Sequence, residues 1–319
     1  RADEADHLHL LQHDAPDLAE SDLNDARLVT AREGGGHGLH AQWADDLHHA
    51  LHVALSGETF GYYPDFEGAL GKTLREVFLH AGTWSSFRGR SHGRPVDRER
   101  LPGYRFLAYL QNHDQVGNRA TGDRLTATVP WQRQAVGAAI VLSSPYTPMI
   151  FMGEEWAAST PWQFFASFPD PELAEAVRTG RRREFGRHGW GESEVPDPID
   201  PETVRRSTLR WDEVSEPGHG ELLDLYRALI ALRRSRPELS DPRLDRFAVR
   251  EEGSVLVLHR GALRVVCNLG GDAEVRLDVE PREVLLASTG VKVDGQAVHL
   301  PADSFAIVDC EAVTPPGRP

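Results

Sequence analysis

The sequence has 319 residues, of which 40% are hydrophobic and 26% are charged, so its composition is that of an ordinary folded protein. The net charge of −14 argues against nucleic acids and anionic membranes as partners, because both favour basic surfaces. The sequence shows no run of 18 apolar residues and no signal-peptide pattern, and Cys267 and Cys310 are too few for a disulfide framework. We therefore expect a cytoplasmic protein that acts on a neutral molecule.

Four short apolar stretches in the first half of the chain each end in polar or acidic residues. They are residues 16–19, 38–43, 106–111 and 148–152, and Glu-Ser-Asp, Asp-Asp, Asn-His-Asp and Gly-Glu-Glu follow them. Helix-like patterns such as DLHHALHVAL and WQRQAVGAAIVLSS come between these stretches. Strands that alternate with helices predict a parallel sheet, and a (β/α) barrel places its working residues at the carboxyl ends of the strands.

The sequence pattern changes twice in the second half of the chain. Residues 160–212 are rich in proline and polar residues, and we expect a loop-rich insertion there. Residues 220–239 follow with one apolar helical face and an arginine-rich end, which predicts a helix. Short alternating stretches then predict a small, sandwich-like antiparallel β domain. The expected organisation is a domain over 1–240, the β domain over 241–312 and a disordered tail over 313–319.

Acidic residues at the predicted strand ends indicate the chemistry. Glycoside hydrolysis uses carboxylates on both sides of one bond, because its transition state resembles an oxocarbenium cation. One carboxyl group must hold a proton for the leaving oxygen, and others must stay ionised. Glu20, Asp114, Glu154 and Glu155 follow predicted strands. A single acid at such a place is most often a solvated loop residue, but His113 and the apolar run before Asp114 set that residue apart.

The histidines offer a weaker alternative. His48 and His52 are four residues apart, a spacing that can bind zinc, but position 49 is histidine where a metalloprotease helix has glutamate. The sequence also lacks a Gly-x-Ser-x-Gly elbow, a phosphate-binding loop and a dinucleotide fingerprint. We expect no catalytic metal and no organic cofactor.

Three stretches, FLAYLQNHDQVGNR, PMIFMGEEWAASTPWQFF and LAESDLNDARLV, resemble the alpha-amylase-type glycoside hydrolases, and within them the maltooligosyltrehalose trehalohydrolase family. Supporting stretches such as GLHAQWADDLHHALH, GETFGYYPDF and FRGRSHGRPVD extend the resemblance over nearly all of residues 18–239. Branching and debranching enzymes share the His-Asp strand end, but they do not usually carry this combination of stretches.

The resemblance implies a retaining hydrolysis on a (β/α)8 barrel, in which the α-1,4 bond next to the terminal trehalose of a maltooligosyl trehalose is cut. Glu20 matches the general acid/base at the end of barrel strand five. Asp114, with His113 beside it, matches the strand-seven acid that grips sugar hydroxyls and stabilises the transition state. Further residues expected to bind the sugar, which is maltooligosyl trehalose or a related α-glucan, are Trp43, Asp45, Asp46, His48, His49, Gln115, Arg119 and Glu155. Trp156, Trp162, Phe164 and Phe165 are candidates for stacking platforms, with core packing equally open.

The carboxylate nucleophile of this family sits at the end of barrel strand four, in an Arg-x-Asp-Ala-type motif. A strand-helix-strand unit takes about 30 residues, and only 19 residues precede Glu20, so Arg1 and Asp3 are too close to form that motif. We therefore expect the second half of a (β/α)8 barrel, strands five to eight, followed by the β domain. On this interpretation the chain is inactive alone and its partner is the N-terminal half of the barrel. Two alternatives are a non-catalytic carbohydrate-binding remnant and another amylase-type enzyme, such as a glycogen branching enzyme.

Overall fold

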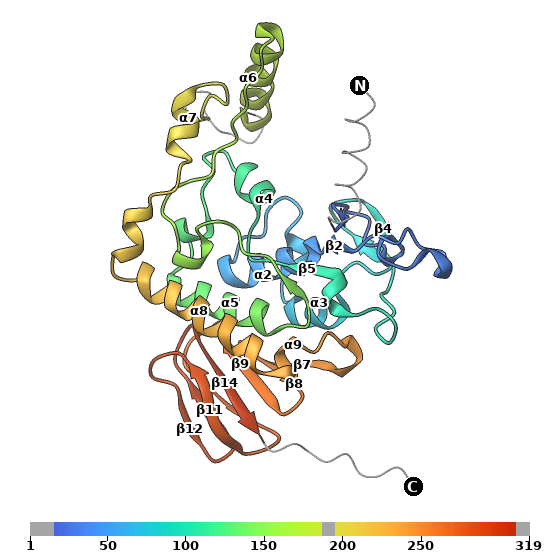
Figure 1. Ribbon diagram of the computed structural model, residues 1–319, viewed down its shortest axis with the longest axis vertical. Coiled ribbons are helices and arrows are strands. Elements are labelled where there is room, and N and C mark those ends of the chain that lie inside the picture. The colour runs from blue at the N-terminus through green and yellow to red at the C-terminus, as the bar shows by residue number, and fades with distance from the viewer. Residues whose placement is uncertain (1–15, 187–194, 311–319) are drawn as a thin grey trace, which may run out of the picture.

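A sheet of four short parallel strands carries the polar strand ends (Figure 1). In the computed structural model, which describes residues 16–186 and 195–310, the strands are β1 (Leu18–Ala19), β2 (Ala41–Trp43), β5 (Phe106–Ala108) and β6 (Thr147–Pro148). They lie in the order β1-β2-β5-β6, and every neighbouring pair is parallel. The predicted parallel sheet is confirmed. Asp3 and the predicted tail 313–319 lie outside the described residues.

The strands are shorter than the apolar stretches that predict them. Residues 109–111 continue the β5 stretch and are buried, but they pair with no neighbouring strand. At the edge of the sheet, Met149 donates one further backbone hydrogen bond to the Ala108 carbonyl (2.9 Å) beyond the end of β6. Apolar residues thus indicate which part of the chain is buried, whereas the backbone hydrogen bonds between strands end where the neighbouring strand diverges.

Helices connect the strands and cover the sheet. They are α2 (Asp45–Ser56), α3 (Leu70–Glu76), α4 (His113–Gly117), α5 (Trp131–Ser143), α6 (Pro171–Gly186), α7 (Pro201–Arg206), α8 (His219–Ser235) and α9 (Pro237–Ser240). The helices predicted from DLHHALHVAL, WQRQAVGAAIVLSS and residues 220–239 are confirmed as α2, α5 and α8. A separate hairpin of β3 (Thr83–Ser85) and β4 (Arg90–His92) lies in the β2–β5 connection.

The prediction of a loop-rich insertion over 160–212 needs correction, because α6 and α7 occupy much of it and extend from the rest of the molecule (Figure 1). Both helices begin with Asp-Pro-Glu. The Asp170 side chain accepts from the Glu172 backbone N–H (2.9 Å), and Asp200 accepts from that of Glu202 (2.8 Å). Aspartate at the N-cap followed by proline at the first helical position is a helix-start signal.

The C-terminal part is a β domain of two antiparallel sheets, as predicted. The larger sheet has the order β11-β14-β9-β8-β7 and the smaller has the order β10-β13-β12. Their strands are β7 (Phe247–Glu252), β8 (Val255–Arg260), β9 (Leu263–Asn268), β10 (Ala273–Arg276), β11 (Pro281–Ala287), β12 (Lys292–Asp294), β13 (Ala297–Leu300) and β14 (Ser304–Cys310).

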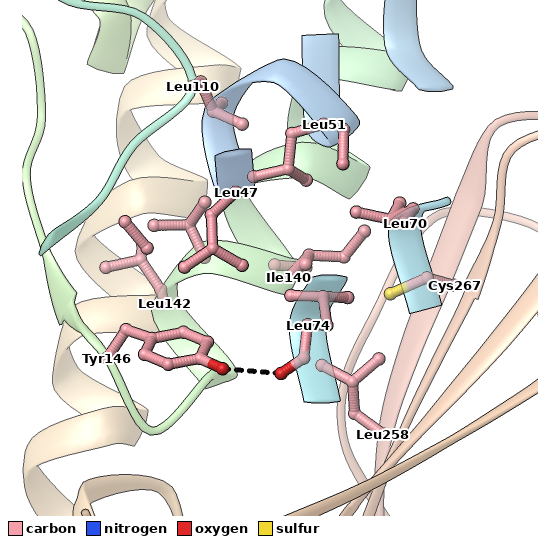
Figure 2. Packing of buried hydrophobic residues seen from close by; sticks show 14 of the residues in the cluster. Leu47, Leu51, Leu70, Leu74, Leu110, Ile140, Leu142, Tyr146, Leu258 and Cys267 are labelled. Carbon is pink, nitrogen blue, oxygen red and sulfur yellow. Dashed lines mark hydrogen bonds between the residues drawn. The ribbon is translucent and has the colours of Figure 1, made fainter. Parts of the chain in front are cut away.

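The central strands of the larger sheet, β8, β9 and β14, are buried on both faces, which joins the β domain to the helices. Val257 and the opposite Val266 belong to the core shared with the smaller sheet. Leu258 on β8 and Cys267 on β9 pack on the other side, against leucines of α2 and α3 (Figure 2). Figure 2 also shows the Tyr146 hydroxyl donating to the Leu74 carbonyl (2.6 Å), which satisfies a buried polar pair in this core.

None of the helices in the described part of the chain combines the length and hydrophobicity needed to cross a membrane.

Candidate active site

The carboxyl ends of the parallel strands bring three predicted site residues together. Glu20 follows β1, and His113 and Asp114 begin α4 after β5. Ligand-type atoms of these three side chains all lie within 4.8 Å of one another, although Glu20 and Asp114 are far apart in sequence. His113 Nε2 lies 3.7 Å from Asp114 Oδ1, and both side chains are 52% exposed. A sugar can therefore reach two carboxyl groups and an imidazole that lie side by side.

Asn112 fixes the direction of this strand end. Its side-chain oxygen accepts from the backbone N–H groups of Asp114 (2.8 Å) and Gln115 (3.2 Å), which makes it the N-cap of α4. The helix therefore begins immediately after the buried stretch, and its first residues present His113 and Asp114 at the sheet edge. Local capping chemistry explains why a buried strand ends in four polar residues.

Trp43 and Asp45 surround this group from β2 and the start of α2. The Trp43 ring meets His113 edge-on at 5.8 Å and Tyr109 edge-on at 5.6 Å between centroids. The buried Tyr109 hydroxyl donates a short hydrogen bond to Asp45. Burial raises the pKa of the Asp45 carboxyl, the Tyr109 hydrogen bond opposes that rise, and the charges of Asp46 and Asp114 add to it. Asp45 is thus held facing the same space as Asp114.

A cavity of about 250 Å³, which we call the carboxylate cavity, opens beside Asp114. Of the residues predicted to bind sugar, Asp45, Asp46, His49 and Gln115 line it. The lining also includes residues that we did not predict, namely Asp22, Asn24, Tyr62, Phe66, His80, Ser85, Phe87, Arg88 and Asn118. Several of these, such as Tyr62 and Arg88, fall in the stretches GETFGYYPDF and FRGRSHGRPVD, so the resemblance was the available signal for them.

Asp46 lies at the back of the carboxylate cavity and acts as a structural anchor. Its Oδ2 accepts from the Asn24 side-chain amide (2.9 Å) and from the backbone N–H groups of Leu79 (2.8 Å) and His80 (3.1 Å). Burial raises the pKa of the Asp46 carboxyl, and these hydrogen bonds oppose only part of that rise. The carboxyl joins the segment after β1 and the segment after α3 to the first turn of α2, and thereby shapes the cavity wall.

His48 and His49 belong to an aromatic cluster. The fully buried His48 ring stacks on Tyr109 at 5.4 Å and does not line the carboxylate cavity. His49 packs against Tyr62 (4.5 Å) and Phe66 (5.0 Å). Burial lowers the pKa of His48 well below its usual value and that of His49 to about 3, so both rings are neutral at pH 7. Their aromatic contacts support the cavity wall, and His49 also faces the cavity.

Gln115, Arg119 and Glu155 occupy three different positions. Gln115 lines the carboxylate cavity, whereas Arg119 is engaged in ion pairs with Glu58 (3.0 Å) and Asp123 (2.5 Å). Glu155 lies in the turn after β6 and does not line the cavity. Glu155 is also not part of the group formed by Glu20, His113 and Asp114, and its role in sugar binding stays a prediction.

The four aromatic residues predicted as possible stacking platforms do not line the carboxylate cavity. Trp156 is buried, and its indole N–H donates to Glu213 Oε1 (3.2 Å), which favours the core-packing alternative for this residue. Trp162 packs edge-on against Phe165 (5.2 Å), and Phe164 lies under the Arg181 guanidinium (4.9 Å).

Within the described residues, the one group of three or more side chains with metal-binding geometry is Glu20, His113 and Asp114. His48 and His52 do not form such a group, and His52 Nε2 pairs with Glu58 Oε2 (2.5 Å). The two-carboxylate chemistry does not require a metal. That the protein uses no metal or organic cofactor stays a prediction.

Comparison with known proteins identifies close relatives. The malto-oligosyltrehalose trehalohydrolase of Rhizobium sp. (strain M-11) is 50% identical over 91% of this chain and 50% of the relative. The enzyme of the same name from Mycobacterium tuberculosis (strain H37Rv) is 48% identical over 91% of this chain and 50% of the relative, and that from Arthrobacter ramosus is 48% identical over 92% and 51%. Residues 242–307 match a domain of unknown function, DUF3459.

Solved structures are similar over the same part of the chain. A candidate alpha amylase from Salmonella typhimurium is 33% identical, with a TM-score of 0.78 over 92% of this chain and 50% of that one. Trehalose-6-phosphate hydrolase from Bacillus licheniformis is 16% identical, with a TM-score of 0.53 over 94% of this chain and 56% of that one, a likeness of fold alone. This chain spans about half the length of the curated relatives it matches. The chain belongs to the malto-oligosyltrehalose trehalohydrolase family, a branch of the alpha-amylase-type glycoside hydrolases.

Proposed function

We propose that this chain supplies the general acid/base and the transition-state-stabilising carboxylate of a retaining glycosidase that frees trehalose from maltooligosyl trehalose. The observation that supports this most strongly is the meeting of Glu20, His113 and Asp114, of which Asp114 also lines the carboxylate cavity. The names of the relatives supply the substrate class. The chain's partner in this reaction is an α-glucan that ends in trehalose.

In this proposal, β1, β2, β5 and β6 are strands five to eight of a (β/α)8 barrel. They belong to a domain over 1–240 that precedes the β domain over 241–312. The four strands are parallel and adjacent in chain order, which is how consecutive barrel strands lie. The remaining strands and the nucleophile then come from sequence that corresponds to the first half of the relatives. A cytoplasmic location is part of the same proposal.

In the proposed reaction Glu20 donates its proton to the glycosidic oxygen as the C–O bond breaks. A carboxylate from the other half of the barrel attacks the anomeric carbon, and a covalent glycosyl ester forms. Glu20, now ionised, removes a proton from a water molecule and is thereby protonated again. The water oxygen attacks the anomeric carbon at the same time and displaces the nucleophilic carboxylate. Asp114 stays ionised and stabilises the positive charge that develops on the sugar.

The test joins this chain to the first half of the Rhizobium relative and measures trehalose release from maltooligosyl trehalose. Glu20→Gln should abolish turnover and retain substrate binding, because the amide keeps the shape but cannot donate the proton. Asp114→Asn should lose most activity, because a neutral amide stabilises the cationic transition state poorly. Glu155→Gln should reduce turnover less than either of these changes, since Glu155 neither lines the carboxylate cavity nor belongs to the group of Glu20, His113 and Asp114. Near-normal turnover in either of the first two variants would show that the replaced residue does not have the proposed role.

One observation favours a second candidate, a carbohydrate-binding function without catalysis for the 319-residue chain by itself. Among the described residues, the group around Glu20 contains Asp114 as its only other carboxylate, and in this mechanism that residue is not the nucleophile. Binding of maltooligosyl trehalose without release of trehalose would support this candidate. New branch points formed from amylose by the joined protein would instead support a branching enzyme.

A further inference from the structure

A second hollow opens from the carboxylate cavity beside α4. This side groove measures about 1020 Å³ and shares Tyr62, Gln115 and Asn118 with the carboxylate cavity. Because the same three side chains line both spaces, the two spaces lie side by side. A chain-like ligand seated next to Asp114 can therefore extend into the side groove.

Phe60 presents an exposed aromatic ring in this groove. It is 66% exposed, although large apolar side chains are usually covered, and it lies in the loop between α2 and the turn at Pro64. The neighbouring Tyr62 continues the aromatic surface toward the carboxylate cavity. Exposed aromatics in a hollow with polar neighbours are typical of ligand sites.

The loop that carries Phe60 is braced from both sides. Arg119 Nη1 donates to both carboxylate oxygens of Glu58 (3.1 and 3.0 Å), and His52 Nε2 pairs with Glu58 Oε2 (2.5 Å). On the other side of Phe60, the Tyr63 ring stacks on His52 at 4.5 Å. A ligand that stacks on Phe60 thus meets a loop that is already positioned, which lowers the entropy cost of binding.

Polar groups accompany these rings. Gln115 Oε1 is buried and has no hydrogen-bond partner among the described residues, and Gln115 lines both hollows. Asn118 and Glu184 add an amide and a carboxylate to the groove wall. A glucose ring offers apolar C–H faces and a rim of hydroxyl groups, and these match an aromatic ring with amides and carboxylates around it.

We propose that the side groove binds glucose units of an α-glucan that extend beyond those in the carboxylate cavity, with Phe60 as their stacking platform. The identity of the ligand rests on the proposed function. Phe60 would then determine how strongly the protein favours long chains over short ones, without contact with the reacting bond.

The test is calorimetric binding of maltoheptaose and maltotriose to the 319-residue chain. Phe60→Ala should weaken maltoheptaose binding about tenfold, the equivalent of ~1.4 kcal/mol, and change maltotriose binding less than about twofold. Phe60→Trp should restore the preference for the longer sugar, because indole also stacks. Tyr104→Ala is the matched control, since Tyr104 is an exposed aromatic in the 3-10 turn before β5 and lines neither hollow.

Equal maltoheptaose affinity in the parent chain and Phe60→Ala would overturn the proposal, as would failure of the parent chain to bind maltoheptaose. Because binding needs no bond cleavage, this result is independent of the trehalose-release test. A chain that binds maltoheptaose through Phe60 but never releases trehalose when joined to its other half would refute the proposed function and leave the groove assignment standing.

Discussion

Asp45 and Asp46 are adjacent in sequence, yet their carboxyl groups have different roles. Asp45 faces the carboxylate cavity and accepts the Tyr109 hydroxyl, whereas one oxygen of Asp46 accepts three hydrogen bonds from two other segments. Both also lie in the first turn of α2, where negative charge is favourable. The site therefore depends on Asp46 for the shape of the space in which Asp45 and Asp114 act.

Replacing Asp46 tests this structural role. Asp46→Ala should lower the free energy of unfolding by about 3 kcal/mol, because it leaves buried N–H groups without an acceptor. Urea unfolding of the 319-residue chain measures the loss. Asp245→Ala, at an exposed position, is the control and should change stability by less than about 0.5 kcal/mol. A loss in Asp46→Ala no larger than in the control would show that these hydrogen bonds do not hold the segments together.

Glu154 makes stability depend on pH. Burial raises the pKa of its carboxyl from 4.5 to about 8, and the Tyr226 hydroxyl donates to its Oε1 (2.9 Å). A raised folded-state pKa favours the folded protein while both states are protonated, and this contribution is lost as pH rises from about 4.5 through 8.

The unfolding free energy attributable to Glu154 should therefore fall between pH 5 and 8, by at most about 1.4 kcal/mol per pH unit. Glu154→Gln cannot ionise, so its stability curve should be flatter over this range than that of the parent chain. Glu67→Gln, at an exposed position, should follow the parent curve. Parallel curves for the parent and Glu154→Gln would show that Glu154 does not titrate in this window.

The sequence indicated Glu20, His113 and Asp114 because each follows an apolar stretch, and the parallel sheet brings such ends together. Tyr109 could not be recognised in the same way, since a tyrosine within an apolar run has the same pattern whether it packs or binds Asp45. Glu155 also follows a strand, but it does not belong to the group of Glu20, His113 and Asp114. A strand-end position therefore indicates which residues can meet, but not which of them do.

At the scale of elements, one side chain of α8 donates hydrogen bonds to the backbone carbonyl groups at the C-terminal end of α5. Arg233 donates to the carbonyl groups of Leu142 (2.7 Å), Ser144 (2.7 Å) and Tyr146 (2.8 Å), where α5 ends and the chain turns into β6. Carbonyl groups in the last turn of a helix lack intrahelical partners, and cationic side chains satisfy them. Arg233 thus secures the connection between α5 and the sheet.

Arg233→Met should lower the unfolding free energy by about 2–4 kcal/mol, because methionine keeps the apolar stem but leaves three carbonyl groups without their donor. The adjacent Arg234 is exposed, and Arg234→Met should have little effect. Thermal and urea unfolding of the two variants compare the positions directly. Equal stabilities would show that water replaces the guanidinium at no cost.

The helices of the insertion show how element prediction failed. Asp170 and Asp200 each precede Pro-Glu, and in the structure both aspartates cap a helix N-terminus. Proline breaks a helix in its interior but is favoured at the first helical position. The aspartate before each proline is the signal that distinguishes these two roles. The β domain was predicted from its short apolar stretches separated by turn residues.

At the scale of the whole molecule, one core joins the two parts. The larger sheet of the β domain packs against α3 and α5, in a core that also includes residues of α2 and α8, while the parallel sheet presents Glu20, Asp114 and the carboxylate cavity. This chain spans about half the length of its curated relatives. The central claim is that its carboxylates act with a nucleophile supplied by sequence that corresponds to the other half.

Trehalose release from maltooligosyl trehalose, compared between the 319-residue chain alone and the chain joined to the first half of the Rhizobium relative, tests this claim most directly. We expect no trehalose from the chain alone and sustained release from the joined protein. Trehalose release by the chain alone would contradict it, because the chain would then contain its own nucleophile.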